Sequence, residues 1–214
     1  FRIYDQPDIN DLSSAKELFK NKINFVKGIV NLNQMPISEI KEICFAGRSN
    51  SGKSTLLNAI SENKKLARVS NTPGRTQEIN FFLIKKKLFI VDLPGYGYAK
   101  APKHKVNDWQ KKIETYLSSR VNLRRVYLLI DVRRGITQKD HFFMKILDQS
   151  AVNFQLIITK SDKFNTNEIQ EMTKKIFFDL HEYVTAYPEI IITSSKKKIG
   201  IDCVRSSIAK LVEF

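Results

Sequence analysis

The sequence predicts an α/β fold of three layers, in which a six-stranded, mostly parallel sheet with one antiparallel strand carries helices on both faces. Three observations support this class. From residue 41 onward, apolar runs of strand length alternate with segments of helical periodicity. Residues 125–132, RVYLLIDV, form an almost continuous apolar run, as expected for a central parallel strand covered on both faces. A glycine-rich turn at residues 47–54 joins the first of these strands to the first helix.

The elements follow one another in a regular order. Strands are predicted for residues 42–47, 78–84, 88–94, 125–132, 153–159 and 189–193. Helices are predicted for residues 52–60, 104–117, 137–149, 167–180 and from 201 onward. Only the three lysines 85–87 separate the second strand from the third, which predicts a hairpin and hence the antiparallel strand. Thr137 and Asp140 have the spacing of a helix N-cap signature. One face of the helix at 104–117 carries Val106, Trp109, Ile113, Tyr116 and Leu117.

The first 40 residues have a weaker pattern. Pro7 and Pro36 interrupt it, and residues 13–26 can begin a helix. We therefore expect residues 1–22 to be a partly ordered N-terminal extension and residues 23–214 to form the domain.

The chain is strongly basic. Its 36 Lys and Arg against 22 Asp and Glu leave a formal charge of +14. A surplus of this size favours an anionic partner, either RNA or a membrane surface, although solvated lysines alone would also account for it. Residues 100–125 concentrate the charge, so we take 104–119 as the first candidate for RNA contact and 194–200 as the second.

Several classes of protein do not fit the composition. Cys44 and Cys203 lack the spacing of a metal site, and the three histidines form no ligand pattern. There is no apolar run long enough to cross a bilayer and no secretory pattern at the start. The expectation is a cytoplasmic protein with no membrane partner, in which Cys44, inside an apolar strand, is a buried and reduced thiol.

Residues 47–54, GRSNSGKS, have the pattern of a phosphate-binding loop. Gly47 and Gly52 let the backbone turn so that successive N–H groups point at phosphate oxygens, and the helix N-terminus adds positive potential. Lys53 can reach the β- and γ-phosphates, while the Ser54 hydroxyl can ligate Mg²⁺.

Two further segments complete this phosphate site. Residues 92–95, DLPG, end a strand, so that Asp92 can hold Mg²⁺ through water and the Gly95 N–H can meet the γ-phosphate. The polar loop at 71–78 lies between the two motifs, and its Thr76 is preferred over Thr72 as a Mg²⁺ ligand that is present only with a triphosphate.

The base is predicted to be guanine. Residues 159–162, TKSD, follow a strand, and the Asp162 carboxylate can accept from the guanine N1–H and exocyclic amine, which adenine does not offer together. The Lys160 stem can lie along the base. Residues 193–196, TSSK, follow the last strand, where the Ser195 N–H is the expected donor to guanine O6.

These motifs resemble the EngB family, bacterial ribosome-biogenesis GTPases of the Era-like branch of P-loop GTPases. The resemblance rests on GRSNSGKS, TPGRTQ, DLPGYGYA, TKSDK and SSKK, and it extends from about Ile23 to the C-terminal end. It implies a Ras-like G domain over 23–214. Residue by residue, it implies nucleotide contacts at Gly47, Arg48, Ser49, Asn50, Ser51, Gly52, Lys53, Ser54, Gly74, Arg75, Thr76, Gln77, Glu78, Asp92, Leu93, Pro94, Gly95, Thr159, Lys160, Ser161, Asp162, Thr193, Ser194 and Ser195.

The resemblance also implies the chemistry and the partners. Lys53, Thr76 and Gly95 are the expected catalytic residues, with Mg²⁺ on Ser54, Thr76 and, through water, Asp92. GTP and GDP are the expected ligands of a monomer that acts in assembly of the large ribosomal subunit, through its ribosomal RNA, and in normal septation and cell division. Thr159 stands where GTPases at large have Asn, although it is similar to this family's own pattern.

Tyr96 follows Gly95 at the position where many GTPases have a Gln that orients the attacking water. Its ring cannot hold a water in that way, so we expect slow hydrolysis. We hypothesise that K⁺, held at Asn50, and a ribosomal partner that orders residues 70–80 together replace the missing Gln. The alternative for Asn50 is that it only braces the loop by hydrogen bonding.

Two other functions remain open at this stage. One is a nucleotide-gated RNA-binding module with no significant hydrolysis, which would share all of these residues. The other is a small-molecule kinase, which would share the phosphate loop but would leave the guanine motifs unexplained.

Overall fold

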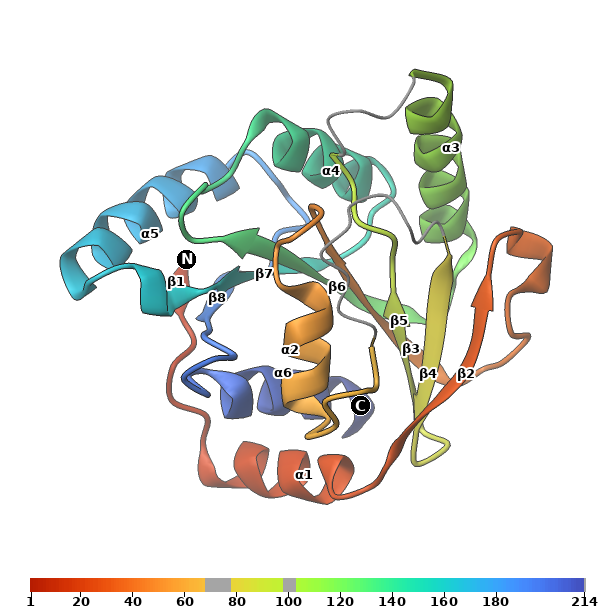
Figure 1. The fold of residues 1–214 in the computed structure, drawn as a ribbon, viewed down its shortest axis with the longest axis horizontal. Helices are drawn as coiled ribbons and strands as arrows, with labels where there is room; N and C mark the ends of the chain where they lie inside the picture. Colours follow the sequence, from red (N-terminus) through yellow and green to blue (C-terminus); the bar gives the residue numbers. More distant parts are fainter. Residues whose placement is uncertain (68–77, 98–102, 214) are drawn as a thin grey trace.

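Residues 1–67, 78–97 and 103–213 are described by the computed structural model, with the backbone alone for 103–106 and 213. One sheet crosses the middle of the molecule, and helices cover both of its faces (Figure 1). Its strands are β1 (Arg2–Ile3), β2 (Ile23–Ile29), β3 (Lys41–Gly47), β4 (Ile79–Ile84), β5 (Leu88–Asp92), β6 (Leu123–Asp131), β7 (Phe154–Thr159) and β8 (Glu189–Ile192). The helices are α1 (Ile9–Phe19), α2 (Lys53–Ile60), α3 (Lys103–Ser119), α4 (Gln138–Gln149), α5 (Thr166–Leu180) and α6 (Ile201–Glu213), with short 3-10 turns η1 (Leu32–Gln34) and η2 (Ser161–Lys163).

Within the described ranges the sheet has eight strands, in the order β1-β8-β7-β6-β3-β5-β4-β2, so the prediction of six was wrong in number. β4 runs antiparallel to its neighbours β5 and β2, and the other neighbouring pairs are parallel. The three-layer class and the single antiparallel strand are therefore confirmed.

The two strands that the sequence did not reveal lie at the edges of the sheet. β1 pairs only two residues with β8, which is too short for any periodic pattern. In β2 only Ile23 and Ile29 are buried, and its register with β4 shifts between Phe25 and Lys27. A partly exposed edge strand with a bulge lacks the alternation by which strands are recognised.

The prediction of a helix within residues 13–26 is only partly correct. α1 ends at Phe19, and the chain continues as β2 from Ile23. The Asn21 side chain donates hydrogen bonds to the carbonyls of Glu17, at 2.8 Å, and Leu18, at 3.2 Å, which satisfies two acceptors at the helix end. Residues 1–22 thus contain β1 and α1, and α1 packs against α6.

The strands divide the core into two clusters, one on each face of the sheet. Along β3, Cys44 and Ala46 face the side covered by α3, α4 and α5, while Ile43 and Phe45 face α1, α2 and α6. This alternation along a fully buried strand follows from the two-residue period of extended backbone. Both cysteines are buried and free. Among the described helices there is none with the length and apolar character to span a membrane.

The apolar face predicted for residues 104–117 packs on the first of these clusters. Ile113, Tyr116 and Leu117 of α3 are buried, and Trp109 packs against them at the margin. The side chain of Val106 lies outside the described part. Beneath α3, the buried Glu42 carboxylate accepts hydrogen bonds from Tyr116 and Arg120.

Candidate guanine-nucleotide site

The candidate site lies at the carboxyl edge of the parallel strands. The segments that follow β3, β5, β6, β7 and β8 all emerge there, because neighbouring parallel strands end at the same edge. These segments contain residues 47–54, 92–97, 131–135, 159–163 and 193–198. The fold therefore brings the separate sequence motifs to one place.

The phosphate loop has the backbone that its glycines predict. At Gly47 an added Cβ would lie 2.6 Å from Ser51 Oγ and 3.0 Å from the Leu129 carbonyl oxygen, so a side chain there would force the loop to shift. Gly52 has φ +97° at the N-cap of α2, in the left-handed region where glycine is favoured. α2 then begins at Lys53, so its unpaired amide groups face the loop, as anion binding requires.

Two side chains from the β7 end brace this loop. Thr159 Oγ1 donates to the Ser51 carbonyl at 2.6 Å, and Lys160 Nζ donates to the Asn50 carbonyl at 2.6 Å. The Lys160 stem, predicted to lie along the base, thus ends at the phosphate loop. Thr159, at the position where GTPases at large have Asn, links the guanine segment to the phosphate segment.

Asp131 belongs to the same site, although the sequence reasoning missed it. Its carboxylate accepts from Lys160 Nζ at 2.8 Å and from Arg133 Nη2 at 2.6 Å. Burial alone would raise the pKa of Asp131, but the hydrogen bonds from Arg133 and Lys160 outweigh it and hold the pKa well below the usual value. The available signal was an acidic residue at the end of an apolar strand, the same signal that marked Asp92.

The guanine segments are held together by a hydrogen bond between their side chains. Ser194 Oγ donates to Asp162 Oδ1 at 2.5 Å, and the Ser161 N–H donates to the Thr193 carbonyl at 3.0 Å. The hydrogen bond from Ser194 is the main reason why the pKa of Asp162 is lowered. Thr193 and Ser194 are fully buried, whereas Ser195 is partly exposed. Asp162 therefore remains an ionised acceptor at neutral pH, fixed by its neighbour.

Lys53 and Asp92 form an ion pair at the other end of the site, between the start of α2 and the end of β5. Each side chain is only about one-tenth exposed, at 12% for Lys53 and 11% for Asp92. The Lys53 ammonium attracts a nucleotide phosphate, and the Asp92 carboxylate attracts Mg²⁺. The pair therefore lies where the phosphates and the Mg²⁺ ion are expected.

The oxygen donors here fit a magnesium ion. Ser54 supplies a hydroxyl in the first turn of α2, Asp92 supplies a carboxylate, and hard oxygen ligands are those that Mg²⁺ prefers. In the part of the chain with described side chains, Ser54 Oγ takes part in no hydrogen bond that would compete. Thr76, the other expected ligand, lies outside the described residues, as do Gly74, Arg75 and Gln77. Glu78 precedes β4 and is exposed.

The DLPG segment shows two kinds of contact. Leu93 is part of the hydrophobic core and Pro94 is buried, so only their backbone could meet a ligand. Gly95 packs directly on the phosphate loop, since an added Cβ would lie 3.1 Å from the Ser49 nitrogen. The ring of Tyr96 stacks on Phe143 at 4.9 Å between centroids. Tyr96 therefore points into the protein rather than toward a phosphate.

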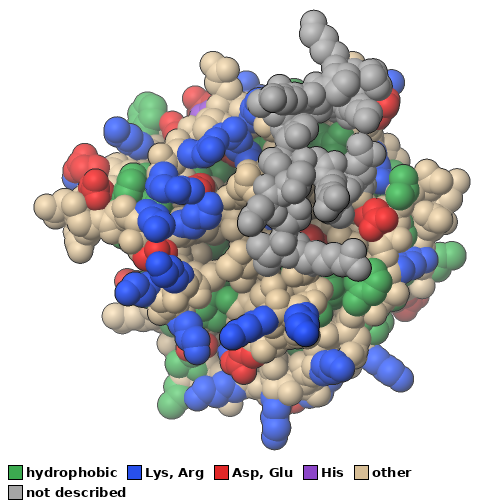
Figure 2. Space-filling model, viewed as in Figure 1, with side chains coloured by type: hydrophobic (Ala, Val, Ile, Leu, Met, Phe, Trp, Pro, Cys, Tyr) green, Lys and Arg blue, Asp and Glu red, His purple; other side chains and the backbone are tan. Residues whose placement is uncertain are grey.

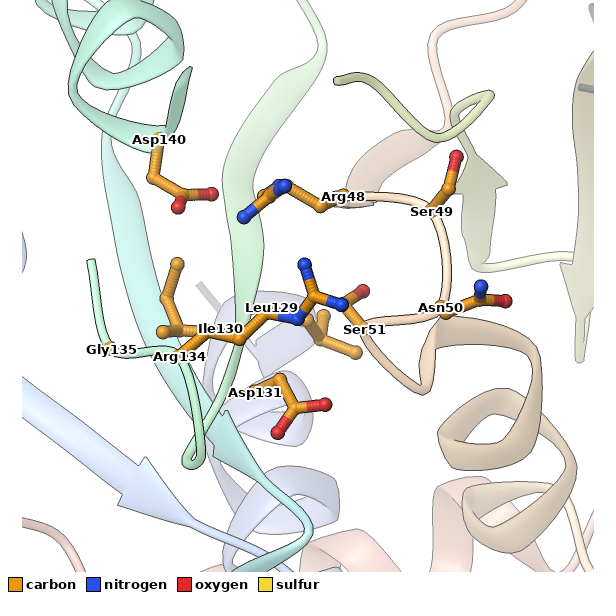
Figure 3. Close-up of a pocket in the computed structure, with 10 residues that line it drawn as sticks. All are labelled: Arg48, Ser49, Asn50, Ser51, Leu129, Ile130, Asp131, Arg134, Gly135 and Asp140. Atoms are coloured by element: carbon orange, nitrogen blue, oxygen red, sulfur yellow. The ribbon is translucent and has the colours of Figure 1, made fainter. Parts of the chain in front are cut away.

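A small cavity separates the phosphate loop from the start of α4 (Figure 3). Its volume is only about 10 Å³, which is roughly the room that one water needs and far less than a nucleotide. Arg48 extends from the loop toward Asp140 across it, while the side chain of Asn50 points away (Figure 3). Among the described residues the Asn50 side chain makes no hydrogen bond. The contact that braces the loop at this position is made by the Asn50 backbone carbonyl, which accepts from Lys160 Nζ.

The comparisons with known proteins agree with this geometry. The family model described as "50S ribosome-binding GTPase" matches residues 42–160. A relative from Ruegeria pomeroyi, with the curated name "Probable GTP-binding protein EngB", is 48% identical over 99% of this chain and 97% of its own. A relative of the same name from Rhodospirillum rubrum is 45% identical over 94% of this chain and 89% of its own.

Solved structures show the same fold. The crystal structure of a "probable GTP-binding protein engB" is 24% identical and covers 80% of this chain and 98% of its own, with a TM-score of 0.63. The GTPase Era, in complex with MgGDPNP and a segment of 16S ribosomal RNA, is 20% identical over 81% of this chain and 57% of its own, with the same TM-score. The fold, the family model and the full-length relatives lead to one conclusion: the chain belongs to the EngB family of GTP-binding proteins and is a GTPase.

Proposed function

We propose that this GTPase hydrolyses GTP slowly with the help of Mg²⁺, and that it acts as a nucleotide-switched assembly factor for the large ribosomal subunit, needed for normal septation and cell division. The observation that carries the nucleotide part is the convergence of Lys53, Ser54, Asp92 and Asp162 at one edge of the sheet. The partner part is supported by the family model and by the basic surface beside that edge.

Bound Mg²⁺ would neutralise charge on the β- and γ-phosphate oxygens, with Ser54 and Thr76 as its protein ligands and Asp92 acting through water. The chain's own residues then bind and orient. Lys53 and the first amides of α2 hold the phosphates, and the Gly95 N–H meets the γ-phosphate. Asp162 selects guanine, since adenine would not supply the two N–H donors that guanine offers to its fixed, ionised carboxylate.

The slow rate follows from Tyr96. Its buried ring contacts Phe143 and Trp109, so it cannot orient a water at the γ-phosphate. We propose that K⁺ at Asn50, with a ribosomal partner that orders residues 70–80, supplies what a Gln supplies elsewhere. Single-turnover hydrolysis measured in K⁺ and Na⁺ buffers, with and without large subunits, tests this proposal. Equal rates in all four conditions would contradict it, and no turnover in any would favour a binding module without hydrolysis.

The surface beside the site is basic. Figure 2 shows Lys and Arg side chains gathered over the part of this face where the β6–α4 and β8–α6 connections lie. The exposed cations of these connections and of η2 are Arg133, Arg134, Lys163, Lys196, Lys197 and Lys198. In α3, by contrast, the described side chains include two lysines, Lys111 and Lys112, and two acids, Asp108 and Glu114. Among the described side chains, the 194–200 segment is therefore the more basic of the two candidates for RNA contact.

A matched pair of variants tests this surface. Replacing Lys196, Lys197 and Lys198 by Gln should weaken co-sedimentation with large ribosomal subunits. It should also reduce the slope of log affinity against log salt concentration by the amount expected for about two to three phosphate contacts. The control replaces the three exposed lysines 85–87, which form the β4–β5 hairpin at the opposite edge of the sheet. Equal loss in both variants would indicate general charge attraction and would contradict a specific RNA-contacting surface.

A further inference from the structure

Tyr96 is attached to two parts of the molecule at once. Its backbone pairs with the phosphate loop: the Ser49 N–H donates to the Tyr96 carbonyl at 3.1 Å, and the Tyr96 N–H donates to the Gly47 carbonyl at 3.3 Å. Its hydroxyl donates to Asp140 Oδ1 on α4 at 2.6 Å. A single residue thus connects the phosphate loop to a helix that is distant in sequence.

Asp140 is the centre of a buried hydrogen-bond network at the start of α4. It is 1% exposed. Besides the Tyr96 hydroxyl, it accepts from the Thr137 N–H at 2.9 Å and from Thr137 Oγ1 at 2.6 Å. The Arg48 guanidinium reaches the same point, donating from Nη1 to Thr137 Oγ1 at 3.4 Å. The start of α4 is therefore linked to the phosphate loop through Tyr96 and also through Arg48.

The Tyr96 side chain has little freedom to move away from this contact. Its ring stacks on Phe143 with an interplanar angle of 22° and lies 5.9 Å from the Trp109 ring. Burial, reinforced by the charge of Asp140, raises the pKa of Tyr96 well above its ordinary value, so the hydroxyl remains a donor at neutral pH. Lys139 of α4 also donates to the Gly97 carbonyl at 3.0 Å, on the far side of Tyr96.

Gly95 immediately precedes this anchored residue and packs on Ser49. The Gly95 Cα and the Tyr96 nitrogen belong to one rigid peptide unit, so a displacement of Tyr96 would carry the Gly95 Cα with it and, through the bond to that Cα, shift the Gly95 N–H. A hydrogen bond to a γ-phosphate weakens steeply with such a shift. GDP has no γ-phosphate, so its binding does not depend on this N–H.

We propose that Asp140 is a positioning residue: through the Tyr96 hydroxyl it fixes the Gly95 N–H at the γ-phosphate and so raises the affinity of the protein for GTP relative to GDP. This inference rests on the proposed function, in which Gly95 meets the γ-phosphate. It assigns to α4 a role in distinguishing the two nucleotides, although the helix contributes none of the residues expected to touch them.

The test compares the dissociation constants of GDP and of a non-hydrolysable GTP analogue, both with Mg²⁺, in three variants. Tyr96→Phe removes the hydroxyl and keeps the stacked ring, and Asp140→Asn removes the charge at nearly constant shape. Each should weaken the GTP analogue about tenfold and leave GDP within about twofold. The loss in the double variant should be smaller than the sum of the two single losses, because both changes act on the hydrogen bond between the Tyr96 hydroxyl and Asp140.

Tyr183→Phe is the matched control. Tyr183 is also buried, and its hydroxyl pairs with His141 of the same helix at 2.8 Å, away from Gly95. We expect it to cost similar stability in urea denaturation and to leave the ratio of the two dissociation constants unchanged.

Two results would overturn the inference. An unchanged ratio in Tyr96→Phe, which removes the hydroxyl outright, would mean that the contact does not position Gly95. Equal weakening of both nucleotides would mean that it only supports the phosphate loop. A wild-type protein that binds neither guanine nucleotide would overturn the proposed function as well, and this would be visible before any variant is compared.

Discussion

At the scale of single residues, the site depends on side chains that hold other parts of the site in place. Thr159 and Ser194 are buried and donate within the protein, to the Ser51 carbonyl and to Asp162. Asp131 acts in a similar way on Lys160. These contacts fix groups that would otherwise have to be ordered when the nucleotide binds, and ordering costs free energy.

Thr159→Ala should weaken the binding of GDP and GTP alike. The change leaves the Ser51 carbonyl without its 2.6 Å donor and loosens the phosphate loop. Loss of one buried hydrogen bond is worth about 1 kcal/mol, or roughly fivefold in affinity. Thr159→Ser keeps the hydroxyl and should retain most of the wild-type affinity for both nucleotides. Fluorescence titration with a labelled GDP measures both, and an unaffected Thr159→Ala variant would exclude the bracing role.

Asp131→Asn should reduce stability in a pH-dependent way. The pKa of Asp131 is lowered in the folded protein, so its contribution is fully present above the pKa of an unfolded Asp, about 3.9, and is lost as the pH falls through the lower folded pKa. Because Arg133 is half exposed, we expect only about 1 kcal/mol. Urea denaturation from pH 7 to pH 3 should show a constant difference between wild type and variant down to about pH 4, and a smaller difference below. A difference that grows on acidification would contradict this sign.

At the scale of elements, the parts that were predicted correctly are those with local signals. The central strand β6 is a long apolar run, and the α4 cap appears as Thr137 and Asp140 three residues apart. The phosphate loop was recognisable because its glycines mark unusual backbone at fixed spacing. β1 and β2 were missed because edge strands are short or partly solvated.

Contacts between distant elements could not be predicted in this way. The sequence indicated that the Tyr96 ring is a poor substitute for a Gln, but it did not indicate that Tyr96 pairs with Asp140. The two residues are 44 positions apart, and the sequence marked Asp140 only as part of a helix cap. Likewise, nothing local pairs Asp131 with Lys160, or Ser194 with Asp162. Such pairs depend on the order of the strands in the sheet, which places loops from remote segments side by side.

The attachment of α3 gives a prediction at this scale. Arg120, at the end of the helix, donates at 2.6 Å to Glu42, which is completely buried in β3. Among the described side chains, Arg120→Ala leaves this carboxylate with the Tyr116 hydroxyl alone, and it should lower the free energy of unfolding by about 3 kcal/mol. Arg124→Ala removes an exposed arginine nearby and should change it by less than about 0.5 kcal/mol. Urea denaturation that found equal effects would show that the buried pair does not anchor the helix.

At the scale of the whole molecule, one sheet separates two hydrophobic clusters and gathers the functional segments at one edge. Strands and helices supply a rigid support, and the nucleotide site is built from the loops that this support holds in place. The exposed cations of the β6–α4 and β8–α6 connections surround the same edge. A change of nucleotide would therefore act on segments that adjoin this basic surface.

The central claim is that this edge binds a guanine nucleotide, with Asp162 selecting the base. Isothermal titration calorimetry on nucleotide-free protein, with GDP and ADP as separate ligands and Mg²⁺ present, tests it most directly. We expect GDP to bind at least about a hundredfold more tightly than ADP, and Asp162→Ala to abolish that preference by weakening GDP alone. Equal binding of ADP and GDP by the wild-type protein, or a preference for GDP that survives in Asp162→Ala, would contradict the claim.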